Sequence, residues 1–165
     1  IPVPYASPPD QFDSLILLLD GIQDPGNVGT LLRSAAAAGV RQVFLSKETA
    51  QVWSPKVLRG AQGAHFYLEL FPDSDLKAII VGFRQFYSTK GQTIALVAHD
   101  GQSLYQSNLQ GPCAIVLGNE GEGVSPALLE AIDVKVTIPM PGGFESLNVA
   151  IAGAVFLFER LRQLN

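Results

Sequence analysis

Short apolar runs alternate along this chain with longer stretches in which apolar and polar residues follow a helical period. The apolar runs predict strands at 15–19, 42–45, 66–71, 93–98, 114–117 and 135–138. The stretches between them predict helices at 24–39, 54–63, 75–87, 125–131 and 146–163. Strand runs that are apolar throughout are typical of parallel strands covered on both faces. The pattern therefore predicts an α/β fold, a mostly parallel sheet with helices on both faces.

Capping residues mark where the helices begin. A capping side chain followed by proline occurs at Asp24-Pro25, Ser54-Pro55 and Ser125-Pro126. The last helix follows a turn with two prolines and two glycines at 139–143. We expect Ser146 to cap this helix and Asn148 to lie inside its first turn.

Beyond Asn148, the last helix is apolar on every side from 149 to 158, and the next strongly polar residue is Glu159. A helix on the surface of a monomer should show a single apolar stripe. We therefore predict a homodimer in which the outward face of this helix, with Gly153 and Ala154, approaches a partner. The first helix, with Leu31, Leu32 and the alanines at 35–38, is expected to contribute as well.

The composition fits one domain with a substantial core, because 47% of the 165 residues are hydrophobic and only 16% are charged. A single cysteine, Cys113, excludes an intrachain disulfide and is consistent with a reducing compartment. The apolar run at 149–158 is too short to span a bilayer, and we see no secretory signal. We expect a cytoplasmic protein with no membrane partner.

The charge pattern leaves two interpretations open. The net charge of −4 argues against simple electrostatic binding of nucleic acid. Eight cations nevertheless fall before residue 91, which is compatible with a basic face or with a solvated scatter; they are Arg33, Arg41, Lys47, Lys56, Arg59, Lys77, Arg84 and Lys90.

Residues 1–14 contain four prolines and no periodicity, which predicts an extended linker, and residues 15–165 then form the domain. A chain that starts inside a linker is what we would expect downstream of a further domain.

Three polar, glycine-rich turns follow strands at 20–29, 117–123 and 139–148. Ligands of open parallel sheets collect at the carboxyl ends of the strands. If the turns meet at one edge, their polar side chains should converge; these are Asn27, Arg33, Glu120, Ser146 and Asn148. Gly29 lies one helical turn before Arg33, so we expect it to leave space for a ligand under the guanidinium. The alternatives are a salt bridge for Arg33, a flexible acidic loop, and an ordinary strand-to-helix connection.

The residue patterns that nucleotide binding, metal binding and nucleophilic hydrolysis require are not found in the sequence. The first turn matches neither the dinucleotide fingerprint nor the P-loop, which counts against an unrelated nucleotide-binding enzyme. The chain shows no metal-ligand spacing, so we expect no metal. Ser146 has no evident general base, and we expect His65 and His99, at strand edges, to be structural.

The three turns together resemble a known family. Asp20 to Arg33 reads D-x-x-x-D-P-x-N-x-G-x-x-x-R, Gly118 to Gly123 reads G-N-E-G-E-G, and Ile138 to Asn148 reads I-P-M-x-G-x-x-E-S-L-N. These resemble the motifs of the SpoU (TrmH-type) branch of the SPOUT RNA methyltransferases, in the same order and spacing. Two departures are Ala150, where the family often has Ser, and the segment 59–62.

The resemblance implies transfer of a methyl group from S-adenosylmethionine to a ribose 2′-hydroxyl of structured RNA, with ribosomal RNA favoured over transfer RNA. It also implies an α/β knot fold with a deep C-terminal trefoil knot, and a homodimer. A non-catalytic knotted RNA-binding module is the other alternative. Arg33 could act as a base or as a phosphate or alkoxide clamp; because guanidinium is hard to deprotonate, we favour the clamp.

Residue roles follow from the same resemblance. Catalysis would involve Arg33 with Asn27, Glu120, Ser146 and Asn148, and RNA would contact Arg33, Lys56 and Arg59. The cofactor would be held by Ala98, Leu117, Gly118, Asn119, Gly121, Ile138, Met140, Ser146, Leu147 and Asn148.

Overall fold

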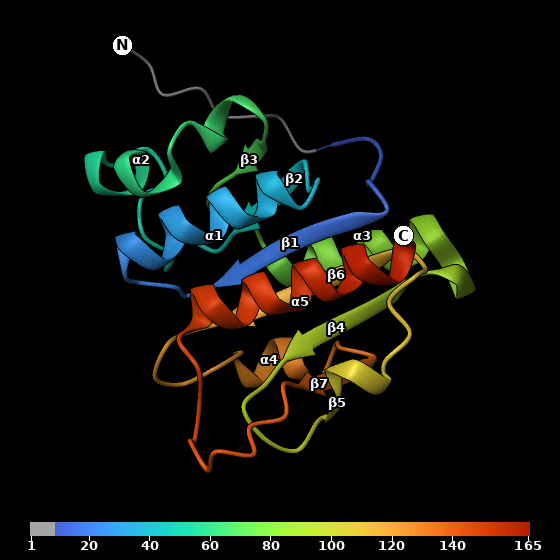
Figure 1. The fold of residues 1–165 in the computed structure, drawn as a ribbon. Helices are drawn as coiled ribbons and strands as arrows, with labels where there is room; N and C mark the ends of the chain where they lie inside the picture. Colours follow the sequence, from blue (N-terminus) through green and yellow to red (C-terminus); the bar gives the residue numbers. More distant parts are fainter. Residues whose placement is uncertain (1–8) are drawn as a thin grey trace.

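Seven strands form one sheet in the computed structural model, which describes residues 9–165 (Figure 1). The order across the sheet is β3-β2-β1-β6-β4-β7-β5, and every neighbouring pair is parallel. The strands are β1 (Leu15–Asp20), β2 (Gln42–Leu45), β3 (Glu69–Phe71), β4 (Gln92–Leu96), β5 (Gln102–Ser103), β6 (Cys113–Gly118) and β7 (Val134–Thr137). The predicted α/β fold with a parallel sheet is confirmed.

Helices cover both faces of this sheet. They are α1 (Pro25–Ala37), α2 (Pro55–Ala61), α3 (Leu76–Tyr87), α4 (Pro126–Leu129) and α5 (Val149–Leu164). Helices α1 and α5 lie side by side on one face, with α2 against the far side of α1, while α3 and α4 cover the opposite face (Figure 1).

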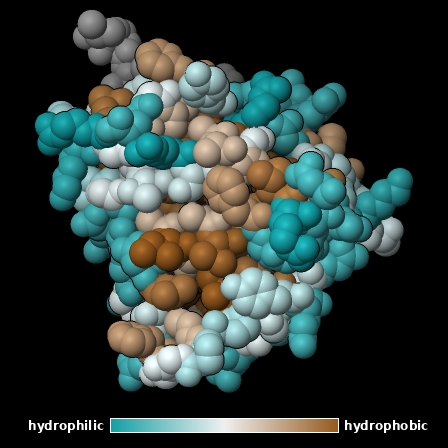
Figure 2. Space-filling view, in the orientation of Figure 1, coloured by the Kyte–Doolittle hydropathy of each residue, from teal (hydrophilic) through white to brown (hydrophobic). Residues whose placement is uncertain are grey.

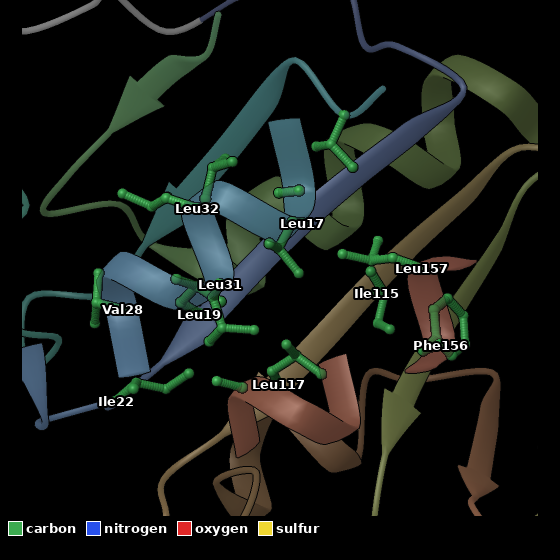
Figure 3. Close-up of a cluster of buried hydrophobic side chains, with 14 of the residues drawn as sticks. Leu17, Leu19, Ile22, Val28, Leu31, Leu32, Ile115, Leu117, Phe156 and Leu157 are labelled. Carbon is green, nitrogen blue, oxygen red and sulfur yellow. The ribbon is translucent and has the colours of Figure 1, made fainter. Parts of the chain in front are cut away.

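The core divides into two layers because successive residues of a strand point to opposite faces. On β1, Leu17 and Leu19 pack toward α1 and α5, whereas Ile16 and Leu18 pack toward α3 and α4. Figure 3 shows the first layer, in which Leu31 of α1 and Phe156 of α5 meet the leucines of the central strands. Both faces of β1 and β6 are buried, as their continuous apolar sequences predict.

The register of the central strands fixes where the turns leave the sheet. Asp20 at the end of β1 pairs with Gly118 at the end of β6, so the turns after these strands start side by side. Strands β4 and β7 flank them in the same direction, which brings the segment after Thr137 to the same edge. The trefoil knot implied by the resemblance stays a prediction.

The predicted strand 66–71 is wrong in its first half. Ala64–Phe66 instead form a short 3-10 helix (η1), closed by a bond from Tyr67 N to Ala64 O (2.9 Å). Only Glu69–Phe71 pair with β2, because their partners on β2 are limited to Gln42–Phe44. The start of β3 is therefore set by its pairing with β2, which the local sequence does not reveal. The very short β5 was also missed.

The predicted linker 1–14 falls partly on residues 1–8, outside the described residues. Residues 11–13 are attached to the domain: Asp13 N donates to Gln42 Oε1 (2.9 Å), and Gln42 Nε2 donates to Gln11 O (3.1 Å). The ring of Phe12 lies edge-on to Phe83, with centroids 5.9 Å apart. Packing against the domain therefore starts before residue 15.

Candidate active site

A cavity of about 690 Å³ opens at the carboxyl edge of the sheet, bounded by the segments that follow β4, β6 and β7 and by the start of α5. Each residue that the resemblance assigns to the cofactor lines it; these are Ala98, Leu117, Gly118, Asn119, Gly121, Ile138, Met140, Ser146, Leu147 and Asn148. Asn27 and Glu120 line it as well. The three polar turns thus meet around one hollow, as the sequence predicts for a parallel sheet.

The turn after β6 is tightly folded. Asn119 N donates to Gly123 O (3.0 Å) and Gly123 N donates to Asn119 O (2.9 Å), which folds the loop back on itself. A methyl group added at Gly118 would collide with the backbone of Gly123 and Val124, so only glycine fits there. The Asn119 side chain donates to Gly21 O (2.8 Å) and holds this turn against the one after β1.

A chain of side-chain hydrogen bonds joins all three turns. Asn148 Nδ2 donates to Asn27 Oδ1 (2.9 Å), and Asn27 Nδ2 donates to Glu120 Oε1 (3.2 Å). Glu120 also accepts bonds from the backbone amides of Gln23 (3.3 Å) and Asp24 (3.2 Å). Partial burial would raise the pKa of Glu120, but these donors and its own amide together lower it. The carboxylate therefore stays ionised and fixes the loop that carries it.

Asn148, and not Ser146, caps α5, which corrects the sequence prediction. Asn148 Oδ1 accepts from the amides of Ala150 (2.9 Å) and Ile151 (3.2 Å), while its Nδ2 reaches Asn27. An asparagine can cap the helix and bond across the fold at once because its amide has both an acceptor and donors. Ser146 is left exposed on the cavity wall, two residues before the cap.

Arg33 is not at this cavity, contrary to the predicted convergence. It lies six residues after Asn27, which is about 9 Å further along the helix axis. Its side chain is exposed and lines a second hollow with Gln62 and Tyr67. The alternative of a salt bridge for Arg33 is not found among residues 9–165, where the group is exposed to solvent.

The expected space beside Gly29 is also absent. A methyl group at Gly29 would lie 2.8 Å from Val57 O and 2.9 Å from Gly60 Cα, both in the backbone of α2. The missing side chain lets two helices touch, and no room remains for a ligand.

The remaining predicted residues fall as follows. Lys56 and Arg59 are exposed on α2. His65 bonds Val52 O (2.8 Å) and packs on Trp53 (4.9 Å between centroids), so it is structural as predicted. His99, also expected to be structural, lies on the cavity wall.

Sequence reasoning did not assign three charged residues to the cavity, which are Asp100, Glu122 and Lys135. The available signal was Gly101, three residues after the end of the fourth predicted strand, which marks another turn at the same edge. With Glu120, the wall carries three carboxylates against one lysine.

Within residues 9–165 no cluster of three His, Cys, Asp or Glu side chains could hold a metal ion. In the same range, no helix is both long and apolar enough to cross a membrane.

The chain matches the SpoU rRNA Methylase family over residues 14–158 and belongs to it. Among curated relatives, it is 38% identical to the 23S rRNA (guanosine(2553)-2′-O)-methyltransferase RlmP of Bacillus subtilis. That match includes 87% of this chain and 56% of the relative. The chain spans less than two thirds of the length of this relative and of two other curated relatives that it matches.

Two solved structures are similar in fold. One, from Porphyromonas gingivalis, is described as belonging to the TrmH family, with TM-score 0.86 and 41% identity over 96% of this chain and 63% of that chain. The other is the SpoU methyltransferase AviRb from Streptomyces viridochromogenes in complex with AdoMet, with TM-score 0.83 and 32% identity over 94% of this chain and 62% of that one.

Proposed function

We propose that this chain is the catalytic part of an S-adenosylmethionine-dependent methyltransferase that modifies a ribose 2′-hydroxyl in ribosomal RNA. The observation that carries the proposal is the cavity in which three separate turns are joined by the Asn148–Asn27–Glu120 hydrogen bonds. Membership in the SpoU rRNA Methylase family and the AdoMet complex of AviRb support the reaction class.

The cavity fits the cofactor in size and chemistry. Its volume of about 690 Å³ is within the range of small-molecule sites. The tight turn at Gly118 brings backbone atoms to the wall, and Leu117, Ile138 and Leu147 supply apolar surface for an adenine ring. The excess of carboxylates suits a ligand that carries a sulfonium and an ammonium group. We assign the ten lining residues named above to this role.

When bound, S-adenosylmethionine supplies a methyl group on a positively charged sulfur. In our proposal Glu120 and Asn27 hold the turns in register, Asn148 fixes the start of α5, and Ser146 offers its exposed hydroxyl to the substrate. Arg33 holds a phosphate or stabilises the developing alkoxide, while positioning contributes most of the rate. Lys56 and Arg59 extend the contact with RNA.

We further propose a homodimer formed through α5. Its outward side chains Ile151 and Phe158 are 55% and 47% exposed. Figure 2 shows a hydrophobic patch over α5 and just below it. Exposed apolar surface of this kind marks interaction sites, and about 800 Å² per subunit would be ordinary.

The residues predicted to form the dimer interface need correction. Gly153 faces inward, where an added methyl group would lie 2.6 Å from Leu31 Cδ2 and 2.7 Å from Leu117 Cδ1. Leu31 and Leu32 are fully buried in the core of the subunit. Ile151 and Phe158 therefore replace Gly153 as the proposed contacts. Sedimentation equilibrium at low micromolar concentration checks this, and a single species of 17.6 kDa would refute the dimer.

In such a dimer, Arg33 of one chain would serve the cavity of the other. Support comes from its position, since within one chain it lies outside the cavity. Mixing two inactive variants, Arg33→Ala and Gly118→Ala, tests the arrangement. Mixed dimers regain one complete site, and hence methyl transfer, only if Arg33 acts on the partner's cavity. Failure to regain activity would show that it acts within its own chain.

The function itself is tested with tritiated S-adenosylmethionine and separately purified ribosomal and transfer RNA. We expect 2′-O-methylation of ribosomal RNA, at a site that is unmodified in cells lacking the protein. Label in transfer RNA alone would identify the alternative substrate. Cofactor and RNA binding without transfer would indicate the non-catalytic module, and binding of NAD or ATP in place of the methyl donor would overturn the class. A cytoplasmic location forms part of this proposal.

A further inference from the structure

Two aromatic side chains that are adjacent in sequence are exposed to solvent, and one of them, Tyr67, lies in the same hollow as Arg33. Phe66 and Tyr67, at the end of η1, are 92% and 75% exposed. Tyr67 and Arg33 line the same shallow hollow of about 240 Å³, whose remaining lining consists of Gln62 and the alanines 36, 37, 61 and 64. Neighbouring aromatic rings exposed to this degree require an explanation, because the fold gives them little to pack against.

The two helices that contact η1, α1 and α2, carry exposed cations. Lys56 and Arg59 are exposed on α2, which lies against α1 and contacts η1 (Figure 1). Within residues 9–165 neither they nor Arg33 forms an ion pair. The nearby Glu69 is paired with Arg41 (3.2 Å), and no carboxylate lines the hollow. A cationic surface on a protein of net charge −4 is suited to a polyanion.

Aromatic rings together with arginines are the means by which proteins hold unpaired RNA bases, by stacking on the ring faces while the cations take the phosphates. Two copies of this surface would not pair with each other, since that contact would place like charges opposite each other.

We propose that Tyr67 and Phe66 form a stacking surface for unpaired bases that flank the methylated nucleotide, with Arg33 on the phosphate between them. The proposal rests on the proposed function, because it assigns Arg33 to RNA. It adds a requirement on the RNA substrate. The substrate must present unpaired nucleotides beside its target ribose, so a continuous duplex would not be a substrate.

The test compares binding of a short single-stranded RNA with binding of the same strand annealed to its complement, by fluorescence anisotropy. The variants are Tyr67→Ala, Phe66→Ala and the double variant, with Tyr67→Phe retaining a ring. Tyr105→Ala is the matched control, since Tyr105 is 55% exposed on a different segment. We expect the wild type to prefer the single strand. Each alanine change should weaken that binding about ten-fold, whereas Tyr67→Phe and Tyr105→Ala leave it unchanged.

Cofactor calorimetry and sedimentation on the same variants separate the explanations. We expect both to be unchanged. If the wild type methylates RNA but the double variant binds the single strand as tightly as the wild type does, the stacking surface is refuted and the proposed function stands. If the double variant changes the oligomeric state, the surface is an interface between copies and the inference is wrong. If the wild type binds the cofactor but no RNA, both proposals fail together.

Discussion

Gly29→Ala is the sharpest test of how α1 and α2 are held together. The new methyl group would lie 2.8 Å from Val57 O, 2.9 Å from Gly60 Cα and 3.1 Å from Ala61 N. These are backbone atoms of a helix, so no rotamer change relieves the overlap. Helix α2 must move away from α1 by several tenths of an ångström, or the first turns of α1 must deform.

Two opposing effects set the size of the change. Overpacking of this kind costs about 1–3 kcal/mol, while alanine gains about 1 kcal/mol over glycine in helix propensity. Because the contacted atoms are backbone, we place the overpacking in the upper part of its range and expect a net loss of about 1–2 kcal/mol. For a domain of this size that lowers Tm by roughly 2–8 °C.

Urea unfolding monitored by circular dichroism measures the change, and an unaltered m-value shows that stability and not compactness has shifted. Gly60→Ala is the graded control, since the atom nearest its methyl group would be Gly29 Cα at 3.3 Å, with the next ones at 3.7 and 3.8 Å, and the change should be near neutral. Gly142→Ala has no neighbour within 4 Å and should change nothing. A Gly29→Ala protein as stable as the wild type would mean that the helices are not in close contact there.

Three further outcomes are expected. Arg33→Ala should keep cofactor affinity within a few-fold but lose most methyl transfer in a single-turnover assay, and near-normal rates in Arg33→Lys would contradict the clamp role, because lysine lacks the bidentate fork. Gly118→Ala should abolish cofactor binding in calorimetry, since the turn cannot close around a methyl group; normal affinity would show that the turn does not form the site. Hydrogen bonds from Arg162 and Gln163 lower the pKa of Glu159 to about 2, below the unfolded value of about 4.3. Its stabilisation is therefore complete above about pH 4.3 and lost as the pH falls toward 2, so the Tm difference between wild type and Glu159→Gln should shrink across that window; a constant difference would argue against the ion pair.

The sequence determined the parts of this protein that depend on local chemistry. The apolar runs at 15–19 and 42–45 are strands because residues buried on both faces of a parallel sheet need no polar side. Asp24 and Ser54 cap their helices as predicted, since a cap needs only its own side chain and an amide a few residues on. The convergence of the three turns also followed, because parallel strands that follow one another end at the same edge.

Tertiary structure determined the features that depend on contacts between segments far apart in the sequence. Asn148 displaces Ser146 as the cap because it can also reach Asn27, a residue 121 positions away in sequence. A side chain at Gly29 would collide with the backbone of α2, and one at Gly153 would collide with Leu31 and Leu117. The local sequence around each glycine does not show which residues will pack against it. Arg33 lies away from the cavity because the rise of α1 over six residues carries it about 9 Å past Asn27 along the helix axis. Each of these depends on a distance between segments, which the amino-acid sequence encodes only through the packing of the whole domain.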